Sequence, residues 1–131
     1  MKLMKQIAVL CIALLIVLIP VVVSAVKPFA SYVFASADVS LNSNKSGIFN
    51  ATTIYATSVS VTSCTLERKD GSKWVDVGSL TPPSHTSSNS YSFSAIANYS
   101  SSLINGNTYR ITAVFSADGE TVTRTSSQRT Y

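Results

Sequence analysis

The hydrophobic and polar positions divide the chain into two parts. Residues 7–23 form one apolar stretch that is interrupted only by Cys11 and Pro20. After it, short runs alternate between apolar and polar residues, and no window of ten or more residues has apolar positions at helical spacing. Alternation with a period of two is typical of strands with one buried face. The chain beyond residue 25 is therefore predicted to be all-β, with no helix longer than a turn.

Seven strands are predicted from these runs. They cover residues 32–41, 48–57, 59–69, 73–78, 90–97, 109–116 and 121–129. The sixth has the clearest alternation. In the second, one face carries Phe49, Ala51, Thr53 and Tyr55. The last run has only Val122 as an apolar residue, which is typical of a polar edge strand.

The third run contains a change of phase. Val59 and Val61 are out of phase with Cys64 and Leu66, so a β-bulge is expected near Thr62 or Ser63. Cys64 shares a face with Leu66 and is predicted to be a small core residue.

Turn residues connect the runs. Asp70-Gly71 and Asp118-Gly119 each stand between two alternating runs, which is a strong hairpin signal because both residues tolerate a positive φ. Pro82 and Pro83 lack a backbone N–H, so the chain is expected to leave the sheet in a loop from Thr81 to about Ser88. Strands of this length, separated by turn signals, predict a single β-sandwich domain.

The N-terminal part has the pattern of a secretory signal peptide. Lys2 and Lys5 precede the apolar stretch, and small residues end it at Val23-Ser24-Ala25. Cleavage is predicted after Ala25, which divides the chain into a helical signal peptide, 1–25, and a secreted domain, 26–131. The alternative is that residues 7–23 remain as a membrane anchor.

Removing the leader changes the bulk properties. Eight basic residues remain against six acidic ones, so the formal charge falls from +4 to +2. No basic stripe is present in the rest of the chain, and a nucleic-acid partner is therefore not expected. Contact with a membrane is expected only through an uncleaved leader. Cys64 is the one cysteine left, so no intrachain disulfide is expected.

One short segment resembles a known fold family. Leu103 and Gly106 precede Tyr109 by six and three residues, and this spacing resembles the tyrosine corner of fibronectin type III and related immunoglobulin-like domains. The resemblance implies an immunoglobulin-like sandwich of about seven antiparallel strands, in which the Tyr109 hydroxyl bonds to a backbone group upstream. Ile111 occupies the place of the immunoglobulin cysteine, and Trp74 follows a hairpin, so an antibody-type domain is not implied.

The leader followed by a Ser/Thr-rich sandwich also resembles small, uncharacterised secreted proteins of Gram-positive bacteria. This resemblance implies no particular activity.

The sequence offers little chemistry. His85 is the only histidine, and no cysteine or carboxylate stands near it at the spacing of metal ligands. A Ser-His-Asp triad could draw on Asp76 or Asp118, but the Gly-x-Ser-x-Gly nucleophile motif is absent from the sequence. No enzyme, metal or cofactor is expected, and an extracellular hydrolase that uses His85 is the least favoured function.

The expected function is non-catalytic. A stable scaffold without chemistry indicates a secreted recognition or adhesion module that binds an extracellular protein or glycan through loops or an exposed edge strand. The expected contact surface comprises Pro82, Pro83, His85, Asp70 and Asp118. The alternative function is a small secreted effector, such as an inhibitor or antimicrobial factor.

Three aromatic residues form a second candidate surface. They could make a platform for a sugar or peptide, and they are Trp74, Tyr91 and Tyr99. Against this, a single tryptophan in a small sandwich usually belongs to the core.

Overall fold

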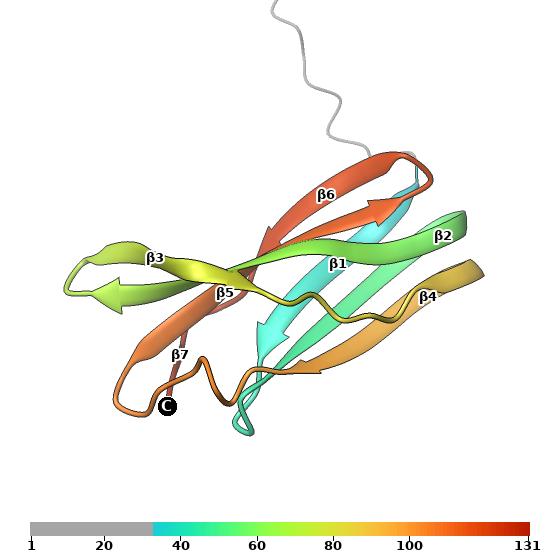
Figure 1. Cartoon of the computed structure of the whole chain (residues 1–131). Helices are drawn as coiled ribbons and strands as arrows, with labels where there is room; N and C mark the ends of the chain where they lie inside the picture. Colours follow the sequence, from blue (N-terminus) through green and yellow to red (C-terminus); the bar gives the residue numbers. More distant parts are fainter. Residues whose placement is uncertain (1–32) are drawn as a thin grey trace, which may run out of the picture.

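The computed structural model describes residues 33–131. Within them the chain is all-β and antiparallel, with seven strands and no helix (Figure 1). The strands are β1 (Phe34–Leu41), β2 (Ser46–Asp70), β3 (Lys73–Leu80), β4 (Ser87–Asn98), β5 (Thr108–Ala117), β6 (Glu120–Thr125) and β7 (Arg129–Thr130). The predicted signal peptide and its cleavage site, Ala25, lie outside the described residues. Within 33–131, no helix is long and apolar enough to cross a membrane.

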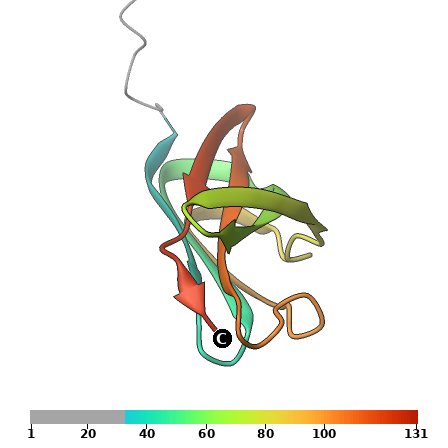
Figure 2. The same ribbon diagram turned by 90° about the vertical axis from the view of Figure 1, so that its left-hand side faces the viewer.

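The long strand β2 organises the whole sheet. Its first half pairs with β1 on one side and β4 on the other. Its second half pairs with β3 and β5, and β5 pairs in turn with β6 and β7. Because β2 bends between these halves, the sheet curls around its own concave face (Figures 1 and 2).

The prediction of separate strands at 48–57 and 59–69 is wrong, since both belong to β2. No glycine, proline, asparagine or aspartate lies between Ala51 and Thr65 to form a turn. The chain therefore stays extended through the bend.

The core lies on the concave face and is centred on three phenylalanines. The ring of Phe115 in β5 lies 6.5 Å from that of Phe49 in β2 and 6.4 Å from that of Phe93 in β4, measured between centroids. Buried and less buried residues alternate along all of β5, which confirms the predicted sixth strand. The first pair is tilted and the second meets edge-on, and such ring contacts add to the stabilisation from burying apolar surface. The aromatic core therefore joins the two halves of the curled sheet.

The predicted bulge and the second hairpin are confirmed. The pairing of β2 with β5 shifts register between Val61 and Ser63. In the β5–β6 hairpin, Asp118 and Gly119 both have a positive φ, of 46° and 86°. Two positive φ values are the mark of a type I′ turn.

The first hairpin forms one residue later than predicted. Asp70 pairs with Lys73, so Gly71 and Ser72 are the central residues of the turn. Of these two, Gly71 alone has a positive φ, of 60°. This matches a type II′ turn, which requires glycine only at the first central position.

The C-terminal segment closes one side of the curled sheet against β1. Arg124 Nε donates a hydrogen bond of 3.1 Å to the Ala37 carbonyl, and Arg129 Nε donates one of 2.7 Å to the Leu41 carbonyl. The predicted strand 121–129 is divided into β6 and β7, because the buried Ser126 turns inward and accepts the Ile111 N–H at its hydroxyl. On the opposite side, β3 and β4 each pair only with β2 and are edge strands.

Candidate functional site

Of the three residues of the predicted tyrosine corner, Leu103 and Gly106 lie in the connection between β4 and β5, and Tyr109 lies at the start of β5. Leu103 is fully buried, and the hydroxyl of the buried Tyr109 accepts a hydrogen bond of 3.3 Å from the Ile104 N–H. Gly106 has a φ of 86°, and its N–H donates to the carbonyl of Tyr131. These contacts fix the path of the loop.

Asp70 and Asp118, two of the expected contact residues, belong to hairpins at opposite ends of the sheet. Asp70 is at the tip of the β2–β3 hairpin, whereas Ala117, next to Asp118, pairs with Val59. Eleven residues of β2 separate these points, which corresponds to roughly 35 Å of strand. Figure 1 shows the hairpins at the two ends of the molecule. The structure therefore does not bring Asp70 and Asp118 into one surface.

Asp118 also has an internal role. Its carboxylate accepts hydrogen bonds of 2.9 Å and 3.0 Å from the backbone N–H groups of Thr57 and Ser58. These bonds tie the β5–β6 hairpin to β2 at the place where β2 changes partners. Charge-assisted bonds to the backbone are among the stronger hydrogen bonds in proteins.

The proline loop, residues 81–86, connects β3 to β4. Pro83 is buried and Pro82 half-buried, so this pair packs inward more than it faces solvent. The exposed His85 stacks on the ring of Phe93 with a centroid distance of 5.6 Å. Among residues 33–131, no three His, Cys, Asp or Glu side chains lie close enough together to hold a metal ion.

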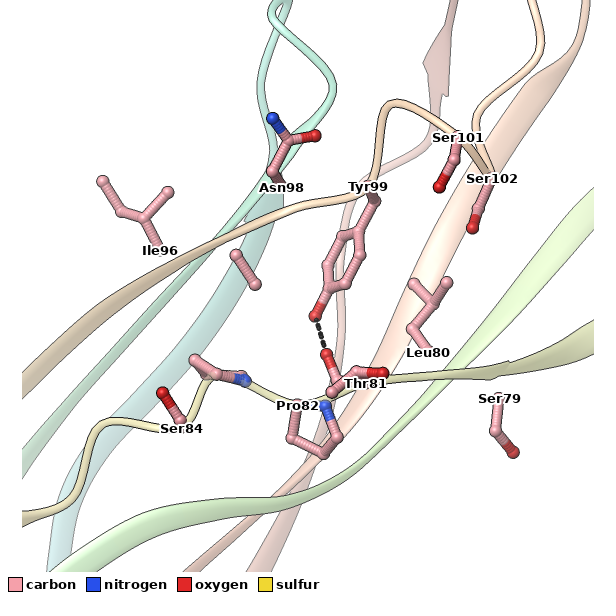
Figure 3. Close-up of a pocket in the computed structure, with 12 residues that line it drawn as sticks. Ser79, Leu80, Thr81, Pro82, Ser84, Ile96, Asn98, Tyr99, Ser101 and Ser102 are labelled. Carbon is pink, nitrogen blue, oxygen red and sulfur yellow. Dashed lines mark hydrogen bonds between the residues drawn. The ribbon is translucent and has the colours of Figure 1, made fainter.

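A groove separates the proline loop from the end of β4 (Figure 3). It has a volume of about 450 Å³ and runs between Leu80–Ser84 on one side and Ile96–Asn98 on the other. Tyr99 spans it, because its hydroxyl donates a hydrogen bond of 2.9 Å to the Thr81 carbonyl (Figure 3). The groove is thus bridged at one point and open elsewhere.

Tyr99 is part of the core and not of an aromatic platform. It is buried, and its ring meets that of Phe49 edge-on at a centroid distance of 6.5 Å. The predicted burial of Cys64 is confirmed, and its sulfur lies 3.9 Å from the Tyr99 hydroxyl. Burial raises the pKa of the Cys64 thiol to about 11, so the group stays protonated at neutral pH.

Trp74 is not a core residue, contrary to the usual position of a single tryptophan. It is half-buried in β3, where little of the strand covers the core. The guanidinium of Arg110 lies 4.3 Å from the centre of its ring, within cation–π range. The same guanidinium makes two hydrogen bonds to the Glu67 carboxylate, of 2.7 Å and 3.0 Å. Trp74, Arg110 and Glu67 thereby connect β3, β5 and β2.

An exposed aromatic pair lies where β2 passes the start of β4. The rings of Tyr55 and Tyr91 meet at a centroid distance of 5.3 Å with an angle of 62° between their planes. Their side chains are 52% and 62% exposed. The Tyr55 hydroxyl donates to Asn89 Oδ1 at 3.5 Å. We call Tyr55, Asn89 and Tyr91 the tyrosine surface.

Sequence reasoning found only half of this surface. Tyr91 was a candidate, but Tyr55 was expected to share a buried face with Phe49. The pairing of β2 with β4 is irregular between Thr52 and Ala56: Thr52 pairs with Ser92 and Ala56 with Ser90, so β2 has extra residues at this point. This irregularity turns Tyr55 outward. An irregular pairing has no clear signature in the sequence.

Comparison with known proteins adds no relative: no family model matches the sequence, and neither does any curated protein or solved structure.

Proposed function

We propose that this chain is a secreted, non-catalytic recognition module that binds an extracellular protein or glycan through the tyrosine surface. The observation that carries the proposal is the pair of largely exposed rings of Tyr55 and Tyr91, which contact each other edge-on. Two adjacent tyrosine rings exposed to water provide apolar surface that a ligand can cover. We also propose that the fold is of the immunoglobulin-like sandwich type. The support is the spacing of Leu103, Gly106 and Tyr109, which resembles the tyrosine corner of those domains.

The surroundings of the pair favour recognition over packing. Neither β4 nor the part of β2 from Ser46 to Leu66 contains a charged residue. Serine and asparagine dominate the start of β4, and Asn89 itself adopts a φ of 49°. Tyrosine combined with serine and asparagine is the composition of adaptable binding surfaces, because the rings supply area and the short polar groups supply hydrogen bonds.

The test is a binding screen with matched variants. The wild-type chain is applied to an array of glycans and to a panel of purified extracellular proteins. The double variant Tyr55→Ala/Tyr91→Ala is then measured against every ligand that binds. We expect its affinity to fall at least about tenfold, as for the loss of central aromatic contacts.

Trp74→Ala is the control, because it removes an aromatic residue near the far end of β2 without changing the tyrosine surface. It should leave the affinity unchanged. Thermal unfolding of each variant shows whether the fold is intact. Full retention of binding by the folded double variant would rule out the tyrosine surface, and no binding by the wild type to any member of either set would count against a recognition function.

A further inference from the structure

Every second residue of β4 directs its backbone N–H and carbonyl away from β2, toward the free edge of the sheet. On the β2 side, the Tyr99 N–H donates to the carbonyl of Lys45, which precedes β2. On the other side, the N–H and the carbonyl of Ser92 both bond to the hydroxyl of Ser90, at 3.1 Å and 2.8 Å. Because backbone groups alternate along an antiparallel strand, both observations place Ser94 and Ile96 toward the edge.

The same alternation directs Asn98 toward this edge. The backbone groups of Ser92 are already bonded to the Ser90 hydroxyl. Ser94, Ile96 and Asn98 therefore present the backbone groups that another strand could use. Among the described strands, β4 hydrogen-bonds only with β2. The groove of about 450 Å³ keeps the proline loop away from Ile96 and Asn98, and the edge therefore remains accessible.

From Ser92 to Asn98, this edge lacks the protections that natural proteins use, since the register shift of β4 against β2 lies between Ser90 and Ser92. Edges are usually blocked by charged residues, proline, bulges or a covering segment. The twelve residues of β4 include no charge and no proline. The other edge, β3, has Lys73, Asp76 and a register shift opposite Leu66 and Glu67. β1 and β6 are linked to each other by Arg124.

We propose that a second copy of this chain pairs with the free edge of β4, so that two β4 strands run antiparallel about a two-fold axis at Ile96. This register places Ile96 opposite its equivalent and Ser94 opposite Asn98 of the second copy. It uses all three accessible residues of each strand. An isologous contact of this type closes on itself and gives a dimer.

The side chains of β4 suit pairing with an identical strand. Ile96 is 68% exposed, and the two-fold register covers it with the same side chain from the second copy. Like charges directly opposite each other would destabilise such a pair, and β4 has none. The same pairing at β3 would place Lys73 and Asp76 at the contact, so β4 is the favoured edge.

Sedimentation of the purified full chain at micromolar concentration tests the dimer. The wild type should be dimeric. Ile96→Lys places two ammonium groups opposite each other, so the dimer dissociation constant should rise at least about tenfold. Asn50→Lys is the matched control, because Asn50 is the direct neighbour of Ser94 in β2 and lies away from the edge; it should leave the dimer unchanged.

A second variant tests the register. In Ile96→Cys, the two thiols lie across the dimer axis and should be joined by a short thiol cross-linker without denaturation. Ile48→Cys, at the position paired with Ile96 in β2, should give no cross-link. Both variants also carry Cys11→Ser, so that the chain's other cysteine cannot react, and Cys64 does not interfere because it is buried.

Three outcomes would overturn the proposal. One is a wild type that stays monomeric at about 100 µM, a concentration at which a dimer of micromolar affinity would be largely formed. Another is an association that Ile96→Lys leaves unchanged, such as one through residues 1–32. The third is equal weakening by Ile96→Lys and Asn50→Lys, which would place the contact on the face of the sheet.

Discussion

Two edge strands of the sheet, β3 and β4, are stabilised in opposite ways. β4 packs on the aromatic core, with Phe93 and Ala95 buried beneath it. In β3, Leu80 alone is buried, and the strand projects beyond the core as one arm of a hairpin. Its contacts are at the surface, where Trp74 stacks on Arg110. One edge is therefore held by hydrophobic burial and the other by its turn and by surface contacts.

This difference also separates two tasks. Charged residues gather at the β2–β3 hairpin, including Glu67, Arg68, Lys69, Asp70 and Lys73. Charge discourages pairing with another chain, so β3 can project into solvent without associating. β4 is held by its buried side chains, Phe93 and Ala95, and needs no surface charge for its own stability. Its edge and the neighbouring tyrosine surface are consequently free for binding.

Truncation of a core side chain should give the largest difference between the edges. We expect Phe93→Ala in β4 to lower the free energy of unfolding by about 3–5 kcal/mol, because it removes a buried ring that contacts Phe115. Val77→Ala in β3 should cost under about 1 kcal/mol, since Val77 is largely exposed. Urea unfolding followed by circular dichroism measures both. Similar losses for the two variants would mean that β3 is anchored as firmly as β4.

Proline substitution should give the next largest effect, within β4 itself. By alternation the N–H of Ala95 points toward β2, so Ala95→Pro should leave a carbonyl of β2 without its donor and cost about 1–3 kcal/mol. Ser94→Pro removes an N–H that faces the free edge and should cost under about 1 kcal/mol. The two variants are compared by the same urea unfolding. The reverse order would show that the backbone direction assigned to β4 is incorrect.

Much of this arrangement could be predicted from local sequence patterns. The regular alternation of β5 and the Asp118-Gly119 turn each depend on a few neighbouring residues. The continuity of β2 was not predicted, because the change of phase near Tyr55 looks like the boundary between two strands. That change reflects an irregular pairing with Ser90 and Ser92 of β4, which lie far away along the chain. The change at Val61 reflects a bulge, which was predicted within a single strand.

The candidate site was harder to predict for the same reason. Whether Trp74 or Tyr91 is buried depends on how far each edge strand extends beyond the core, which no local pattern records. The separation of Asp70 from Asp118 follows from the length of β2. If residues 48–57 and 59–69 formed two separate strands, as predicted, these hairpins could lie closer together.

The smallest expected effect concerns acid and the surface contacts of β3. The hydrogen bonds from Arg110 are the main reason that the pKa of Glu67 lies below its usual value. A carboxyl whose pKa is lowered by folding stabilises the protein above its unfolded pKa, and this contribution is lost as the pH falls through the folded pKa. Because the pair lies near the surface, the loss should be small and should decrease with added salt.

Glu67→Gln isolates this contribution, because it keeps the shape of the side chain and removes the charge. Between pH 7 and pH 3, the free energy of unfolding should fall further for the wild type than for Glu67→Gln. The protection factors of the β3 amides, which correct for the intrinsic pH dependence of hydrogen exchange, should fall in the wild type over the same interval. Those of β4 should change less, since β4 depends on burial and not on charge. Parallel pH profiles for the two proteins would show that Glu67 adds nothing measurable, leaving the hairpin turn and the Trp74–Arg110 stack to hold β3.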